Sequence, residues 1–184
     1  CAEEGSNPEQ IEESQRAMSK MREILGHPGR IKKLAADIVQ HYEVLCAEKP
    51  EVIQKGIIVC ADRSLAFSLL EEIVSIRPDW GEKKKAEDES VLSKEELDKL
   101  KPLAKINLVA TQGKDDKKKL FEACGTKEYR KMLDKQFKNI NSNFKIAVVV
   151  DMWITGFDVP SLAVMYIDKP LQKHTLIQTI SRVN

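Results

Sequence analysis

The segment from Lys145 to the end of the chain contains the pattern that most limits how this sequence can fold. Residues 145–150 form a short apolar run rich in valine, which is typical of a strand buried on both faces. An acid, Asp151, and a polar turn follow, then a second apolar run at 162–167 and a helical pattern from 172. This order predicts an α/β sheet, in which ligands bind where the strands end.

The rest of the chain alternates strands with helices in the same way. Apolar runs at 56–60 and 105–110 predict two more buried strands, and helical periodicity predicts a helix at 30–45. Such alternation favours a mostly parallel sheet covered by helices on both faces. Because parallel strands end at one rim, the residues expected there are Asp62, Thr111, Asp151 and Asp168.

The sequence suggests one domain with two additions. Residues 1–28 are polar and predict a tether or a remnant of a preceding domain, whereas residues 29–184 predict the α/β domain itself. Residues 78–104 are rich in charges of both signs and predict a surface insertion, with a short solvated helix at 93–100. A start without Met and an end within a helical pattern predict a piece of a longer protein.

Composition excludes several classes of protein. The formal net charge is +1, from 30 Lys and Arg against 29 Asp and Glu, which argues against a globally basic nucleic-acid binder. A local stripe of Lys and Arg is still sufficient to follow phosphates. The four cysteines form no C-x-x-C pair, so we predict neither a metal site nor disulfides, and a cytoplasmic location. No apolar run approaches the roughly 20 residues of a membrane span.

Two strand ends offer candidates for phosphate contacts. Asp62 and Ser64 precede a helix at the end of the 56–60 strand, where either residue can cap the helix and where free N–H groups can bind phosphate. Capping is the simpler explanation for Asp62. Thr111 follows the next strand beside Gly113 and a group of lysines, which would suit a nucleic-acid backbone or merely form a turn.

The last helical pattern carries two distinct faces. One is apolar, and the other is a polar stripe composed of His174, Gln178, Ser181 and Arg182. A neutral hydrogen-bonding group beside a guanidinium suits nucleotide recognition, although a solvated surface is an equal alternative. The chain has no phosphate loop and no dinucleotide-binding glycine turn. If it binds ATP, it therefore supplies the second half of a composite site.

These residues match a known family. The segments VDMWITGFDVP and MYIDKPLQKHTLIQTISRVN resemble motifs V and VI of superfamily 2 helicases, in the form found in the motor (R) subunit of type I restriction enzymes. IIVCADRSLAFSLLEEI resembles motif IV, and KINLVAT the strand that follows it. The resemblance covers about residues 30–184 and implies a three-layer RecA-like domain, the second of two in such motors.

The resemblance also implies roles at the nucleotide. Gly156 and Asp158 match the motif V residues that approach it, with the acid as a partner of the ribose hydroxyls. Gln178 and Arg182 match the Gln and first Arg of Q-x-x-x-R-x-x-R, and Arg182 would act as an arginine finger. Ser181 stands where many helicases have Gly, which leaves a small-residue requirement there in doubt.

Other matched positions imply contacts with DNA. Thr111, Thr155 and Ser64 occupy places where such motors touch the nucleic-acid backbone. The implied partners are double-stranded DNA, a first RecA-like domain of the same chain, and the modification and specificity subunits. The implied cofactors are ATP and Mg²⁺, bound chiefly by the first domain. The whole would be an ATP-dependent type I site-specific deoxyribonuclease, and this piece alone is expected to be inactive.

Three alternatives remain open from the sequence. The chain could be the C-terminal domain of another superfamily 2 helicase or repair translocase. It could be a stand-alone α/β domain that binds Mg²⁺ and phosphate through Asp62 and Asp151. It could also be an interaction module that uses the charged insertion, which predicts that deletion of residues 80–100 abolishes partner binding and leaves the fold intact.

Overall fold

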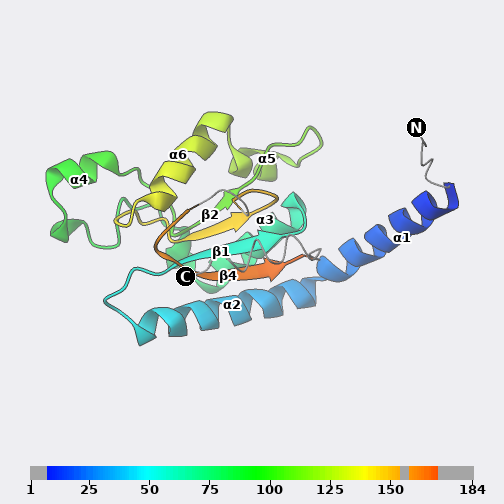
Figure 1. Cartoon of the computed structure of the whole chain (residues 1–184), viewed down its shortest axis with the longest axis horizontal. Helices are drawn as coiled ribbons and strands as arrows, with labels where there is room; N and C mark the ends of the chain where they lie inside the picture. Colours follow the sequence, from blue (N-terminus) through cyan, green and yellow to red (C-terminus); the bar gives the residue numbers. More distant parts are fainter. Residues whose placement is uncertain (1–7, 154–157, 170–184) are drawn as a thin grey trace, which may run out of the picture.

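The computed structural model describes residues 8–153 and 158–169 (Figure 1). Its helices are α1 (Pro8–Leu25), α2 (Pro28–Glu48), α3 (Arg63–Ile76), α4 (Lys94–Lys99), α5 (Lys118–Cys124) and α6 (Lys127–Lys138), with 3₁₀ turns at Pro78–Gly81 and Glu89–Val91. Its strands are β1 (Lys55–Cys60), β2 (Ile106–Val109), β3 (Ile146–Val149) and β4 (Leu162–Asp168). Each strand predicted from the sequence is confirmed within one or two residues.

The four described strands form one parallel sheet in the order β2-β3-β1-β4. Gly56 pairs with Ile146 on one side and with Val164 on the other, so β1 is a central strand. Its six residues are all buried, which explains the unbroken apolar run in the sequence. The predicted α/β class with a parallel sheet is confirmed.

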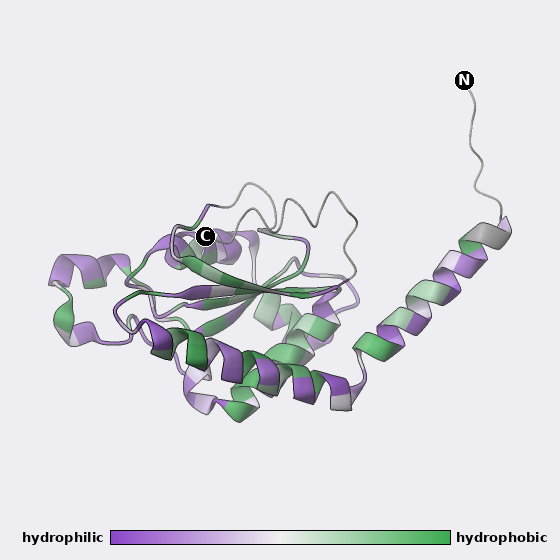
Figure 2. Ribbon diagram, turned by 60° about the horizontal axis from the view of Figure 1, so that its bottom comes forward, coloured by the Kyte–Doolittle hydropathy of each residue, from purple (hydrophilic) through white to green (hydrophobic). Residues whose placement is uncertain are grey.

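The two faces of the sheet bury separate sets of apolar side chains, and Figure 2 shows hydrophobic and hydrophilic residues alternating along the ribbon of α2 beside the sheet. In β1, Ile58 and Cys60 face the core formed with α2, α3 and α5, whereas Ile57 and Val59 face the opposite core. That second core receives Leu133 and Phe137 from α6. Alternate side chains of each strand thus enter the cores on the two faces of the sheet, which gives the three layers that were expected.

The carboxyl end of α6 is held by two lysines, one at the start of β1 and one directly before β3. Lys55 is completely buried, and its ammonium donates to the carbonyls of Phe137 and Asn139. Lys145 donates to the carbonyl of Ile140 at 3.0 Å. These carbonyls lie at or just after the carboxyl end of α6, where they have no intrahelical partner, so the side-chain N–H groups of the two lysines satisfy them.

The charged segment 78–104 is bound to the domain more firmly than its composition predicts. Trp80, Leu100 and Leu103 are buried, and Lys84 forms an isolated antiparallel bridge with Leu103. Trp80 stacks edge-on against Tyr42 of α2, with ring centroids 5.7 Å apart. The surface insertion predicted from its charges is therefore anchored to the domain by three apolar side chains, which its composition did not reveal.

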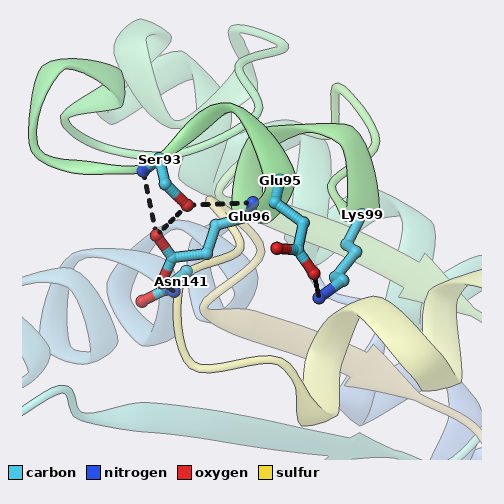
Figure 3. Close-up of polar contacts among 5 residues, drawn as sticks. All are labelled: Ser93, Glu95, Glu96, Lys99 and Asn141. Atoms are coloured by element: carbon cyan, nitrogen blue, oxygen red, sulfur yellow. Dashed lines mark hydrogen bonds and ion pairs between the residues drawn. The ribbon is translucent and has the colours of Figure 1, made fainter.

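The helix predicted within this segment is confirmed as α4. Figure 3 shows its capping box: Ser93 accepts from the backbone N–H of Glu96, and the Glu96 carboxylate accepts from the backbone N–H of Ser93 at 2.9 Å. Asn141 reaches the same carboxylate from the loop after α6, and a Glu95–Lys99 ion pair spans one turn. Local caps stabilise this short helix although it buries no side chain.

Helix α1 extends away from the sheet (Figure 1). The tether expected at residues 1–28 is thus helical over residues 8–25, and Ile11, Met18 and Met21 are exposed along it. Among the described helices, none is long and apolar enough to cross a membrane.

Candidate functional site

The parallel arrangement brings the ends of all four described strands to one edge of the sheet, as predicted. An open cavity of ≈ 580 Å³ lies there, between the segments that follow β1 and β3. Its lining includes Asp62, Arg63 and Ser64 from the start of α3 and Asp151 from the loop after β3. The strand ends therefore form a common polar surface rather than isolated turns.

Asp62 is the N-cap of α3. Its carboxylate accepts from the backbone N–H of Leu65 at 3.0 Å, and its second oxygen lies 3.7 Å from Nε of Arg22. The capping interpretation is thereby confirmed. Ser64 is exposed one residue into the helix and also lines a second cavity of ≈ 530 Å³ with Lys117. Its hydroxyl is accessible for the predicted backbone contact.

An ion pair joins α3 to the loop after β2. Arg63 donates from Nε to Oδ1 of Asp116 at 3.1 Å, and the backbone N–H of Gly113 donates to Oδ2 at 2.6 Å. A side chain at Gly113 would disturb this arrangement, because a Cβ at this position would lie 2.0 Å from Nη2 of Arg63 and the guanidinium would have to move. This loop begins at Thr111, so the ion pair fixes the segment that carries a predicted DNA contact.

The loop after β3 has an unusual backbone. Asp151 and Trp153 are non-glycine residues with φ of 51° and 61°, in the left-handed region that bulky residues rarely adopt. The Trp153 ring packs against Phe137 and Phe144, with centroids 5.3 and 6.5 Å away. Packing therefore holds this strained turn directly before residues 154–157, and such strain often accompanies a functional site.

A buried carboxylate, Asp168, ties the end of the edge strand β4 to helix α2. Asp168 accepts two hydrogen bonds from the guanidinium of Arg30 at the start of α2, one of them at 3.3 Å. Asp151 in turn accepts from Nζ of Lys169 at 2.8 Å. The acids of the rim thus already have cationic partners.

Potential metal ligands do not gather in the described part of the chain, where no group of three or more His, Cys, Asp or Glu side chains is placed to hold an ion. The two acids of the Mg²⁺ alternative are both engaged: Asp62 caps a helix and Asp151 pairs with a lysine.

The predicted site residues divide into two groups. Ser64, Thr111 and Asp158 are described by the structure and are exposed: Ser64 and Thr111 follow β1 and β2, whereas Asp158 lies in the segment that precedes β4. The other predicted residues, Gly156, Thr155, Gln178 and Arg182, lie outside the described residues.

Sequence reasoning missed two kinds of residue. Asp116 and Arg30 were not singled out, because each finds its partner far away in the chain and lies in an ordinary charged stretch. It also missed the lysines of α6, which line a groove of ≈ 440 Å³ together with Thr111 and Trp153. Their spacing of four residues was visible and could have indicated one helix face.

Known proteins resemble this chain over most of its length. Residues 62–184 match the family described as type I restriction enzyme subunit R domain 3. The type I restriction enzyme HindI endonuclease subunit of Haemophilus influenzae is 32% identical over 95% of this chain, which corresponds to 15% of the relative. The type I restriction enzyme SauCOLORF180P endonuclease subunit of Staphylococcus aureus is 41% identical over 35% of the chain, or 7% of the relative.

The chain thus spans about 15% of the length of the Haemophilus influenzae relative. The family match covers the rim, from the cap of α3 through the loops after β2 and β3. Together with the parallel sheet, it identifies the chain as a member of the type I restriction enzyme R subunit family, corresponding to domain 3 of that subunit.

Proposed function

We propose that this domain is the second RecA-like half of the ATP-dependent DNA translocase motor in a type I restriction enzyme R subunit. The observation that carries the proposal is the polar rim of a parallel sheet within the matched family region. Ser64 and Thr111 are exposed on that rim, at positions matched to backbone contacts in superfamily 2 motors.

ATP would bind between this domain and a first RecA-like domain of the same subunit, which would supply the phosphate loop and the Mg²⁺ ligands. Asp158, whose side chain is exposed, would accept hydrogen bonds from the ribose hydroxyls, with Gly156 close to the nucleotide. Gln178 and Arg182 would face the γ-phosphate, and the guanidinium would stabilise charge that develops as the phosphoryl group is transferred. Closure and reopening of the two domains would then follow the cycle of ATP binding and hydrolysis.

Movement along DNA would use contacts with the backbone rather than with the bases. Hydroxyls of Ser64, Thr111 and Thr155 can each donate to a phosphate oxygen, and such contacts carry no sequence information. This suits a motor that must step along any sequence. Recognition of the restriction site would belong to a specificity subunit and methylation to a modification subunit. The nuclease centre would lie elsewhere in the R subunit, and this domain alone would not turn over ATP.

The test is the substitution Arg182→Ala in the complete R subunit. Loss of a charge that acts mainly in the transition state should lower the ATP turnover rate on the order of 10³-fold or more, while DNA binding is largely retained. Arg16→Ala is a matched control, because Arg16 is exposed on α1 and pairs only with Glu12 among the described residues. Near-normal ATP turnover by Arg182→Ala would remove the arginine-finger assignment.

A further inference from the structure

Helix α6 carries a row of basic side chains on its outer face. Lys127, Lys131 and Lys135 repeat at every fourth residue, and all three are exposed. Four residues advance an α-helix by about 6 Å, so the three side chains form one continuous row along the axis. We refer to these three lysines as the α6 ridge.

The ridge borders a groove that reaches the rim of the sheet. The groove has a volume of ≈ 440 Å³ and is also lined by Thr111, Arg130, Met152 and Trp153. Thr111 follows β2 and the two apolar residues follow β3, so three separate segments meet here. The exposed hydroxyl of Thr111 therefore shares a groove with the ridge, although the two are separated in the sequence by the whole of α5.

The groove keeps a strong positive charge. Among its described lining residues, Asp134 is the only acid, and it forms an ion pair with Lys138 at 3.0 Å. No ion pair is found for the three ridge lysines among the residues that the structure describes. By contrast, Lys99 and Lys105 each lie about 3 Å from a glutamate, Glu95 and Glu87 respectively. The ridge is thus a local basic surface on a chain with a formal net charge of only +1.

We propose that the α6 ridge binds the phosphate backbone of duplex DNA and extends the backbone contact assigned to Thr111. The inference rests on the proposed motor function. A row of ammonium groups on a rigid helix matches a regular row of phosphates, and each lysine that neutralises a phosphate releases a condensed counterion. The ridge contributes charge but no base-specific hydrogen bond, as a translocase requires.

Duplex DNA fits this groove better than a single strand. Binding of single strands relies on aromatic rings on which unpaired bases stack. The aromatic residue of this groove, Trp153, instead packs its ring against Phe137 and Phe144 in the core of the domain. The groove thus offers cations and a hydroxyl, which suit a continuous phosphate backbone.

The test measures the salt dependence of DNA binding by the complete R subunit without ATP. The probe is a duplex that lacks a restriction site, and its affinity is followed by fluorescence anisotropy between about 50 and 200 mM salt. In the triple variant Lys127→Gln, Lys131→Gln, Lys135→Gln, the slope of log K against log salt should decrease in magnitude by about 2 to 3. A single-stranded probe of the same length should show a smaller change.

Two control variants test whether the change in slope depends on the position of the lysines and on their charge. The triple variant Lys32→Gln, Lys33→Gln, Lys94→Gln removes three exposed lysines from α2 and α4 and should keep the wild-type slope. The variant with arginine at the three ridge positions retains the charge and should also keep that slope. Circular dichroism confirms that each variant is folded, and since all six lysines are exposed, none of the substitutions opens a cavity.

The outcomes separate this inference from the proposed function. An unchanged slope in the ridge variant, with normal DNA binding by the wild type, would refute DNA binding by the ridge but would leave the proposed motor function intact. An equal loss in the control variant would refute it too, because the effect would then be one of general charge. If the wild-type subunit neither binds duplex DNA nor shows DNA-dependent ATP turnover, both the proposed motor function and DNA binding by the ridge are refuted.

Discussion

Arg63 and Asp116 form an ion pair, with 3.1 Å between Nη2 and Oδ1, that ties the start of α3 to the loop after β2. The Asp116 side chain is only 6% exposed, and its second oxygen accepts from the backbone N–H of Gly113. One carboxylate thereby fixes the two segments that carry Ser64 and Thr111. Substitutions here should alter both the stability of the rim and the DNA contacts proposed for it.

Gly113→Ala should weaken this link. The new Cβ would lie 2.0 Å from Nη2 of Arg63, so the flexible arginine must move and leave Asp116. Because Arg63 is 36% exposed, we expect a loss of only about 1 kcal/mol in the free energy of unfolding by urea. In an Arg63→Ala background the same substitution should cost less, and equal costs in both backgrounds would contradict a coupling between the two residues.

Arg30→Ala should destabilise the edge strand. It leaves the Asp168 carboxylate, which is only 9% exposed, without its two hydrogen bonds. Since Arg30 itself is 34% exposed, solvent moderates the loss, and we expect a decrease of about 1–3 kcal/mol in the free energy of unfolding. Arg77→Ala is the control, because its partner Glu43 is well exposed. A smaller effect for Arg30→Ala than for Arg77→Ala would contradict this interpretation.

Lys55 should make stability depend on pH. Burial, together with the nearby charge of Lys145, lowers the pKa of Lys55 to about 7 from an ordinary value of 10.5. Between these two pH values the unfolded chain binds more protons than the folded one, so stability should rise with pH. The rise should approach about 1.4 kcal/mol per pH unit.

Urea unfolding of the wild type and of Lys55→Met from pH 6 to pH 10 measures this contribution. Methionine cannot titrate, so the difference between the two proteins should shift in favour of the wild type from about pH 7 upwards. Parallel curves for the two proteins would show that Lys55 keeps its ordinary proton affinity in the fold.

Thr111→Val should weaken DNA binding without changing its salt dependence. Valine has nearly the same shape but no hydroxyl, so one hydrogen bond from a neutral donor to a charged phosphate oxygen is lost. A hydrogen bond to a charged group contributes about 1.5–3 kcal/mol, which corresponds to a loss of affinity of roughly 10- to 150-fold. No charge is removed, so the slope of log K against log salt should stay the same, unlike in the ridge variants. Thr111→Ser restores the hydroxyl and serves as the control.

Much of the fold was predictable because strand burial leaves a local signal. The runs that became β1 and β3 are apolar throughout, since both faces of each strand are covered. The cap at Asp62 was also predictable, because this residue precedes a helical pattern and accepts from the first turn of the helix. The burial of Trp80 was not predicted, because one aromatic residue in a charged stretch does not reveal that it packs on Tyr42.

The candidate site was predictable in part. The parallel order placed Ser64 and Thr111 on one rim, as the sequence suggested. The turn at Trp153, with its positive φ, was not expected, because the phenylalanine rings that hold it come from α6 and from the segment before β3. The roles of Gln178 and Arg182 remain predictions.

The alternation of strands and helices, the parallel sheet and the likeness to the R subunit motifs could be predicted, because they depend on local patterns of apolar and capping residues. Which charged groups meet depends instead on how the elements pack in three dimensions. Arg30 finds Asp168 across 138 positions, and the lysines of α6 reach the groove of Thr111, because the sheet orders its strands β2-β3-β1-β4. Local periodicity cannot encode that order, since it arises from how the crossover connections pack on the two faces of the sheet.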